Sequence, residues 1–241
     1  MQKGIKFRIY PNREQKNFIH QTLGCCRLIY NRGLAMRKES YEEGKKIGYT
    51  QTSAMLTELK RQEEFAFLKA ADSIALQQSL RDLDRSFVNF FQKRASYPTF
   101  KSKHNRFQSY RTVNQKDNIR IVGRYIKLPK LGFVKIRQSM EVGKINHVTV
   151  EYTPAGKYFA VLNVDFEPEP RPNAGGTIGI DVGIKAFYSD SNGNTVSNPR
   201  YLERSMRKLI REQRRLSGKQ KDSHNRGKQR LRVARVHEKI A

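Results

Sequence analysis

The spacing of apolar residues predicts a strand and then a helical region in the first part of the chain. Residues 4–10 alternate apolar with polar side chains and stop at Pro11, as a short strand does. Asn12, with Gln15 three residues later, carries the capping-box signature of a helix start. Helical spacing continues to about residue 95, and its clearest apolar stripe is Leu76, Leu80, Leu83, Phe87 and Phe90. Residues at that spacing share one helix face, so the stripe predicts a helix packed on a core.

From about residue 117 the pattern changes to short apolar alternations that are separated by glycine and proline. The turn Pro154-Ala155-Gly156 between two such runs predicts a hairpin. Several short strands joined in this way predict a small antiparallel β-barrel. We expect the strand at residues 4–10 to join the same sheet, which makes the helical region an insertion. The predicted barrel therefore comprises residues 1–12 and 112–168, and the inserted helical region comprises residues 13–111.

A connector rich in proline and glycine at residues 169–176 predicts a domain boundary. The last domain, residues 177–241, opens with an alternating run whose apolar face is Ile178, Ile180, Val182 and Ile184. Asn192-Gly193 predicts a hairpin after it, and helical patterns follow at about 200–216 and 224–240. We expect the first of these helices to cover that apolar face with its own stripe of Leu202, Met206 and Leu209.

The charge of the chain points to a polyanionic partner. There are 48 Lys and Arg against 22 Asp and Glu, a net charge of +26 over 241 residues. Nucleic acid is the commonest partner for a field of that size, and the 37% hydrophobic content is enough to bury cores. Cys25 and Cys26 are adjacent, which excludes a C-x-x-C zinc ribbon. No signal peptide or apolar run of membrane length is present, which predicts a cytoplasmic, nucleoid-associated protein without membrane contact.

Two groups of residues have the chemistry of a nucleic-acid contact. In the segment 97–111, basic residues alternate with aromatic ones, and its candidate contacts are Tyr97, Phe100, Lys101, Lys103, Arg106 and Arg111. Cations neutralise phosphates and aromatic rings stack on bases, although a solvated loop is the alternative. On the helix that carries the apolar stripe, Gln78, Arg81 and Arg85 project from the opposite face. These three residues are candidates on the same grounds, and simple solvation is again the alternative.

Asp181 is the candidate catalytic residue. In the strand predicted at residues 177–184, it shares a face with Gly179 and Gly183, so that face is bare except for one carboxylate. A metal ion and a phosphate backbone can approach such a carboxylate closely. The alternative is a buried strand that carries an aspartate at a turn.

Five segments, taken in order, resemble the TnpB family, the OrfB-type proteins of bacterial insertion sequences. They are Lys6 to Pro11, Gly24 to Asn31, Leu76 to Phe91, Tyr97 to Lys103 and Gly179 to Ile184. The resemblance covers the whole chain and implies an RNA-guided DNA endonuclease related to type V CRISPR effectors. The expected fold is α+β and multidomain: a wedge barrel with an inserted helical recognition lobe, then the N-terminal part of an RNase H-like RuvC domain.

The resemblance also implies the partners, the cofactor and the roles of several residues. The partners would be guide RNA and double-stranded DNA, and Asp181 would be the first RuvC carboxylate and a Mg²⁺ ligand. Within the Gly24 to Asn31 segment, Arg27, Tyr30 and Asn31 join the candidate nucleic-acid contacts.

Family members continue well beyond this length, through a glutamate, a four-cysteine zinc ribbon and a last aspartate that complete the site. Since several carboxylates are needed to hold two metal ions, we expect a truncated protein that has no zinc site and does not cleave alone. Three interpretations remain: a cleavage-deficient family member, a nuclease-dead RNA-guided DNA-binding protein or repressor, and a generic basic RNA-binding protein. The ordered segments disfavour only the third.

Overall fold

The computed structural model describes residues 1–105, 107–137, 140, 142–168 and 175–241. The chain folds into two compact units, Met1–Phe166 and Glu167–Ala241. Most of the connector expected at residues 169–176 lies outside the described residues. None of the described helices is both long and apolar enough to cross a membrane.

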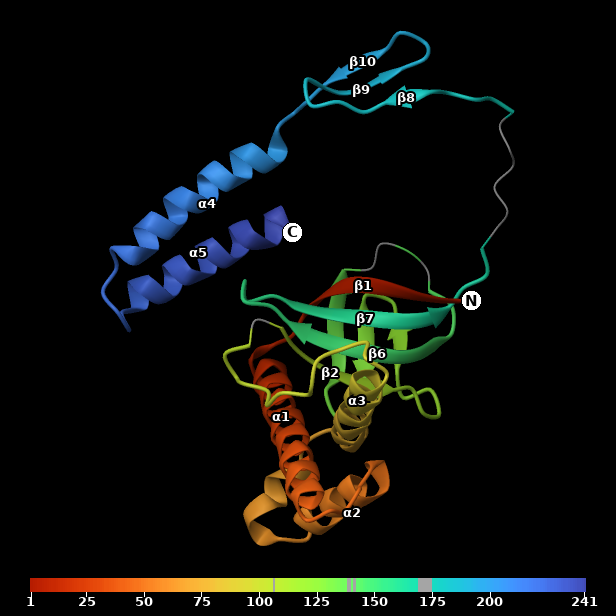
Figure 1. Ribbon diagram of the computed structural model, residues 1–241, viewed down its shortest axis with the longest axis vertical. Helices are drawn as coiled ribbons and strands as arrows, with labels where there is room; N and C mark the ends of the chain where they lie inside the picture. Colours follow the sequence, from red (N-terminus) through yellow and green to blue (C-terminus); the bar gives the residue numbers. More distant parts are fainter. Residues whose placement is uncertain (106, 138–139, 141, 169–174) are drawn as a thin grey trace. The chain divides into compact units, whose positions relative to one another are not determined.

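The first unit combines a curled antiparallel sheet with helices (Figure 1). Its helices are α1 (Arg13–Glu42), α2 (Tyr49–Leu59), the 3-10 helix η1 (Glu63–Lys69) and α3 (Ser73–Phe91). Its strands are β1 (Gln2–Tyr10), β2 (Gln108–Val113), β3 (Arg120–Val122), β4 (Tyr125–Leu128), β5 (Gly132–Arg137), β6 (Ile145–Tyr152) and β7 (Tyr158–Asp165). The seven strands run in the order β2-β6-β7-β1-β5-β4-β3. Because β1 lies between β7 and β5, helices α1 to α3 are an insertion into the sheet, as expected.

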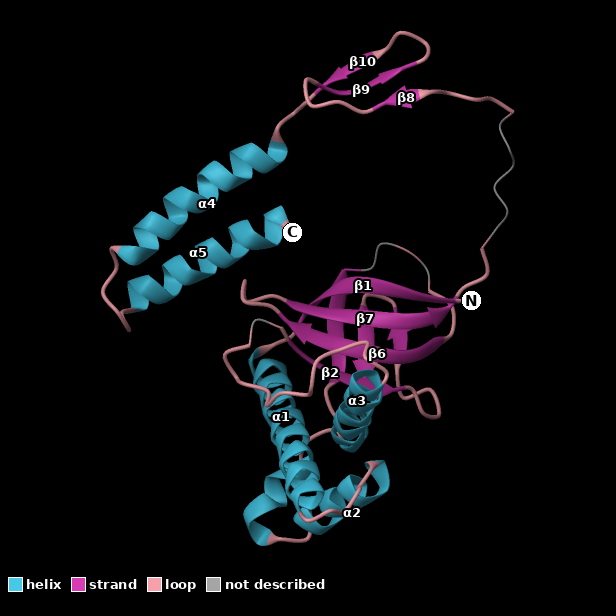
Figure 2. Ribbon diagram, viewed as in Figure 1, coloured by secondary structure: helices cyan, strands magenta, loops and turns pink. Residues whose placement is uncertain are grey.

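The closed barrel expected from the sequence is not formed. Among the described residues no pairing joins the two outer strands, β2 and β3, so the sheet is a half-barrel (Figure 2). The physical reason is the short edge: β3 has three residues, all of which pair with β4. Closure requires two edge strands of matched length and stagger.

Strand β2 begins four residues before the predicted start of the sheet at residue 112. Tyr110 and Thr112 are buried and lie opposite Val150 and Val148 of β6. The side chain of Arg111, between them, is on the other face of the sheet. The last residues of the predicted basic loop are therefore part of strand β2. The sequence did not reveal this strand, because its buried and exposed positions alternate among mostly polar residues.

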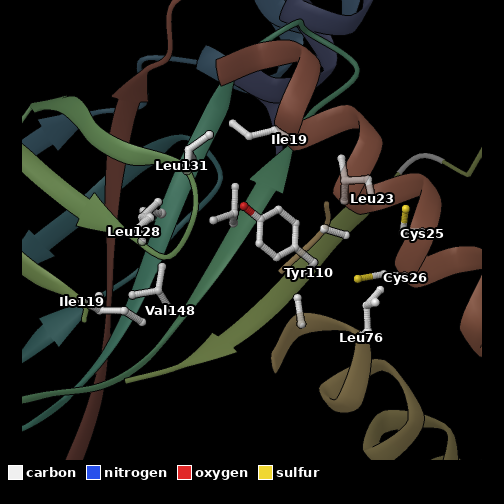
Figure 3. Packing of buried hydrophobic residues seen from close by; sticks show 14 of the residues in the cluster. Ile19, Leu23, Cys25, Cys26, Leu76, Tyr110, Ile119, Leu128, Leu131 and Val148 are labelled. Carbon is white, nitrogen blue, oxygen red and sulfur yellow. The ribbon is translucent and has the colours of Figure 1, made fainter. Parts of the chain in front are cut away.

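The core lies between the sheet and the inserted helices. Helix α1 begins at the expected capping box, in which the Asn12 Oδ1 accepts from the Gln15 backbone N–H at 2.8 Å. Four residues of the predicted stripe, Leu76, Leu80, Leu83 and Phe87, are buried, which confirms the face on which α3 packs. Figure 3 shows Leu23 and Cys26 of α1 pointing toward Leu76 of α3 and Tyr110 of β2. This packing turns the other face of α3 outward.

A close approach of α1 and α3 makes Gly33 a sensitive position. A Cβ added at Gly33 would lie 2.9 Å from Leu80 Cδ2 and 3.0 Å from Leu83 Cδ2, and both leucines are buried. We expect Gly33→Ala to destabilise the protein by about 1–3 kcal/mol through overpacking. In the same helix, a Cβ added at Gly24 would lie 3.9 Å from Arg27 Nη2, which is an ordinary contact distance. Gly24→Ala should therefore stabilise the protein by up to about 1 kcal/mol, because alanine has the better helix propensity. Urea unfolding of the two variants measures both values, and equal effects would contradict this packing.

The second unit has little core. Its three strands, β8 (Ile180–Asp181), β9 (Ala186–Asp190) and β10 (Thr195–Ser197), form one sheet in the order β10-β9-β8. The two helices are α4 (Tyr201–Ser217) and α5 (His224–Ile240). Leu209 of α4 is buried against Val233 and Val236 of α5. The Asn192-Gly193 hairpin forms as expected between β9 and β10.

The long strand expected at residues 177–184 is not formed. Only two of its residues pair, Ile180 with Asp190 and Asp181 with Ser189. The predicted apolar face is exposed at all four positions, Ile178, Ile180, Val182 and Ile184. The stripe expected to cover it is not available, because Leu209 is buried on α5 and Leu202 and Met206 are exposed. This unit does not establish an RNase H-like fold, which stays a prediction.

Candidate nucleic-acid interface and the Asp181 strand

The outward face of α3 brings four predicted contact residues into one hollow. Gln78, Arg81 and Arg85 are spaced by three and four residues, so they share the face opposite the buried leucines. Arg111 of β2 joins them, and the hollow has a volume of about 600 Å³. Its remaining lining residues are Tyr49, Asp84, Val88, Val113 and His147. The sequence predicted the helix face and Arg111 separately, and the fold places them together.

Ion pairs fix the orientation of the charges around this hollow. The Arg111 guanidinium is paired with the Asp82 carboxylate, and Arg37 Nη2 lies 3.0 Å from Asp84 Oδ1. The Arg81 guanidinium carbon lies 4.9 Å from the centre of the Tyr49 ring. Besides these ion pairs, the exposed Arg81 and Arg85 add two positive charges to the lining, so the hollow is positive and presents donors in planar forks. Such forks match the geometry of phosphate oxygens.

His147 adds hydrogen-bonding capacity rather than charge. Burial and then the positive charge of Arg111 lower the pKa of His147 below its ordinary value of 6.5. The imidazole is therefore neutral at pH 7, with one ring nitrogen as donor and the other as acceptor. Sequence reasoning missed both His147 and Tyr49, because no local pattern connects either residue with α3.

The basic segment after α3 is anchored to α1. The Asn31 side chain donates to the Lys101 carbonyl at 2.9 Å and accepts from the Lys101 backbone N–H at 2.8 Å. The Lys101 ammonium lies 3.9 Å from the centre of the Tyr30 ring, and desolvation lowers the pKa of Lys101 against the opposing effect of Asp82. Tyr30 is only 5% exposed, so its ring has no face for a base. Tyr30 and Asn31 therefore support the loop, and their contact with nucleic acid stays a prediction.

The remaining candidates lie along this segment. Arg27, Lys101 and Arg111 line a smaller cavity of about 130 Å³. The Lys103 carbonyl accepts a hydrogen bond from the Gln108 side chain. Tyr97 is 40% exposed and Phe100 is 50% exposed, with rings open to a ligand. Arg106 lies outside the described residues.

Asp181 is exposed and lies on the two-residue strand β8, whereas Gly179 and Gly183 lie outside that strand. The nearest acid on the neighbouring strand is Asp190, whose pairing residue is Ile180. The Asp190 carboxylate already accepts from the Asn192 N–H at 3.0 Å, the Asn194 N–H at 2.9 Å and the Asn194 side chain at 2.8 Å. The hydrogen bonds from Asn194, and then that from Asn192, lower the pKa of Asp190. Asp190 therefore shapes the hairpin turn.

The carboxylates in the described part of the chain do not fit a complete two-metal site. Across residues 1–105, 107–137, 140, 142–168 and 175–241, no three His, Cys, Asp or Glu side chains are grouped for metal binding. Two-metal hydrolysis holds its ions about 3.5–4 Å apart between several carboxylates. The role of Asp181 as one such ligand stays a prediction, and the described residues do not group the further ligands around it.

Two family models match the chain. A "Helix-turn-helix domain" model of the OrfB proteins of IS605 elements matches residues 1–46, and a "Probable transposase" model of the same proteins matches residues 147–241. Residues 1–46 contain β1 and one uninterrupted helix of 30 residues, so this range by itself does not form two helices joined by a turn.

Curated relatives match along the whole chain. The chain is 37% identical over its full length to a Streptomyces pristinaespiralis protein named "Putative RNA-guided DNA endonuclease". It is 34% identical over 99% of its length to the Escherichia coli K12 protein "Putative RNA-guided DNA endonuclease InsQ". The chain spans 60% of the length of each. A solved chain titled "Cryo-EM structure of CRISPR-Cas12f Ternary Complex" matches with a TM-score of 0.39 at 12% identity, over 95% of this chain and 57% of that one.

Proposed function

The chain belongs to the OrfB-type family of insertion-sequence transposases, the TnpB family, and from this premise we propose that it binds guide RNA and double-stranded DNA. The names of the two curated relatives support this proposal. The net charge of +26 supports it independently, because neutralised phosphates release counterions on binding.

The hollow formed by Gln78, Arg81, Arg85 and Arg111 is the observation that carries the proposal. Its arginines present forks suited to phosphate oxygens. A glutamine can pair with the edge of adenine through two hydrogen bonds, so Gln78 is placed to read a base while the arginines hold the backbone. We propose that this hollow contacts the sugar-phosphate backbone of the bound nucleic acid.

Asp181 takes a limited role in this proposal. As the first carboxylate of a RuvC site, it would be one Mg²⁺ ligand, and Mg²⁺ would stabilise the charge that develops on the phosphate. The described residues supply this ligand without the others, so a polypeptide of these 241 residues is proposed to bind without cutting. In this proposal, cleavage requires an assembly in which further carboxylates join Asp181.

The contribution of the hollow can be measured with paired charge removals. We expect Arg81→Ala/Arg85→Ala to make the dependence of log K on log salt shallower by about 1.4 on single strands and about 1.8 on a duplex. These values follow from about 0.7 and 0.9 per phosphate contact. The measurement is filter binding of a labelled RNA hairpin with a single-stranded tail, and of a DNA duplex, over a salt series.

The matched control is Arg120→Ala/Arg124→Ala, which removes the same charge from exposed positions on and beside β3 in the same unit. It should leave the slope near that of the wild-type chain. Equal slopes in the two variants would mean that the arginines of the hollow are only solvated, and the proposed interface would be wrong.

A further inference from the structure

A second hollow, lined by aromatic rings, lies where the ends of α1 and α3 meet. Its volume is about 660 Å³. The rings that line it are Tyr41, Phe87, Phe90, Phe91 and Tyr97. Arg37, Lys45, Lys46 and Ile47 complete the lining. Only Tyr97 among these residues was a candidate on sequence grounds, and none of them lines the hollow that contains Arg81.

The rings hold one another in place while several stay open. Tyr97 meets Phe87 at 5.5 Å and Phe90 at 5.2 Å between ring centres, both edge to face. Phe91 packs on Phe90 at 5.3 Å and yet is 74% exposed, and Tyr41 is 73% exposed. Phe91 packs on its neighbours and is exposed, so it presents a π-face at a small entropic cost on binding, and Tyr41 adds a second exposed ring to the lining.

Cations surround these rings. The Arg37 guanidinium carbon lies 4.3 Å from the centre of the Phe87 ring, and its Nε donates to the Ile47 carbonyl at 3.0 Å, which holds the loop that carries Lys45 and Lys46. Lys38 Nζ lies 5.6 Å from the centre of the Tyr97 ring. Two carboxylates near the rings are paired with cations of the lining: Asp84 with Arg37, and Glu43 with Lys45 at 3.0 Å.

We propose that this aromatic hollow is a stacking site for an unpaired nucleotide in a single-stranded segment of nucleic acid. The base would stack on the exposed rings of Tyr41 and Phe91, and its phosphate would lie against Lys45 and Lys46. Base stacking on aromatic side chains is tolerant of sequence, since every base has a π-face. The positive rim favours this occupant over an apolar peptide, because a polyanion complements it. The inference rests on the proposed function for its partner.

The test separates stacking from charge. The probes are a single-stranded RNA oligonucleotide and the DNA of the same sequence, each compared with a copy in which the central bases are replaced by abasic sites. The wild-type chain should bind the intact oligonucleotide about tenfold more tightly than the abasic copy, because one base stacked on an aromatic ring contributes about that factor to the affinity. The ratio of affinities for the intact and the abasic oligonucleotide is then compared between RNA and DNA. The nucleic acid with the larger ratio is the natural source of the stacked nucleotide.

Tyr41→Ala/Phe91→Ala should bring the preference close to one and leave the salt slope unchanged, because no charge is removed. The matched control is Tyr125→Ala/Phe133→Ala, two exposed rings on β4 and β5, which should keep the wild-type preference. Thermal unfolding confirms that each variant is folded.

The inference and the proposed function fail in different ways. Tight, salt-dependent binding with no preference for intact bases would overturn the stacking site alone, as would a preference that survives in the Tyr41→Ala/Phe91→Ala variant. A wild-type chain that binds neither oligonucleotide at low salt would overturn the proposed function, and the stacking site with it.

Discussion

A polypeptide of these 241 residues should leave supercoiled plasmid DNA intact in the presence of Mg²⁺ and a guide RNA matched to the plasmid. Asp181 lies on a strand of two residues, and the one acid on the neighbouring strand, Asp190, is occupied by the hairpin turn. A single carboxylate cannot hold two cations at the spacing that in-line hydrolysis requires. Agarose gel electrophoresis over a time course measures the outcome as loss of the supercoiled form.

The control for this result is Asp181→Ala. If the wild-type polypeptide cuts and the Asp181→Ala variant does not, the described residues assemble a working site, and the interpretation of Asp181 as an isolated carboxylate is wrong. If both preparations cut equally, a contaminating nuclease is responsible, and a further purification step must remove that cutting.

Binding to nucleic acid should weaken steeply with salt. A protein that neutralises at least six phosphates loses about 10³-fold or more in affinity between roughly 50 and 200 mM salt. The charge of +26 and the positive hollow on α3 lead us to expect a loss of that size for the RNA hairpin probe. A fluorescence anisotropy titration at several salt concentrations gives the slope directly.

Sodium glutamate in place of chloride, with the cation concentration held constant, checks that the loss reflects cation release. A change in Kd of less than about tenfold over this range would correspond to fewer than about two phosphate contacts. Such a result would contradict an interface built on charge and would leave base stacking as the main source of affinity.

Local signals predicted many of the individual elements. The capping box of Asn12 and Gln15 starts α1, and the stripe from Leu76 to Phe87 is the buried face of α3. These signals are contained within a few residues, since a cap or a helix face depends on the adjacent turns. The hairpin at Asn192-Gly193 follows from the same kind of local chemistry.

The elements that were predicted wrongly depend on distant partners. The exposed apolar row from Ile178 to Ile184 has the alternation of a buried strand, yet only Ile180 and Asp181 find partners on β9. Alternation states which side chains share a face, but burial requires a second surface. That surface was expected from α4, whose Leu209 packs on α5 instead.

The candidate site also has a part that local sequence signals predict and a part that depends on distant residues. Helical spacing correctly grouped Gln78, Arg81 and Arg85, because two turns of α3 determine their face. It could not reveal that Asn31 is bonded to Lys101, 70 residues later, which gives Asn31 a supporting role beside its predicted contact role. The rings of Tyr41 and Phe91 were missed for a related reason, since they meet only through the packing of α1 on α3.

Ultraviolet cross-linking of the whole chain to the labelled RNA hairpin, followed by mass spectrometry of the peptides, tests the proposed interface most directly. Cross-linked nucleotides should be found on peptides from α3 and from the basic segment that precedes β2, with fewer adducts in the Arg81→Ala/Arg85→Ala variant. Adducts confined to α4 and α5, with none on peptides from residues 73–113, would contradict the assignment of the nucleic-acid interface to the first unit.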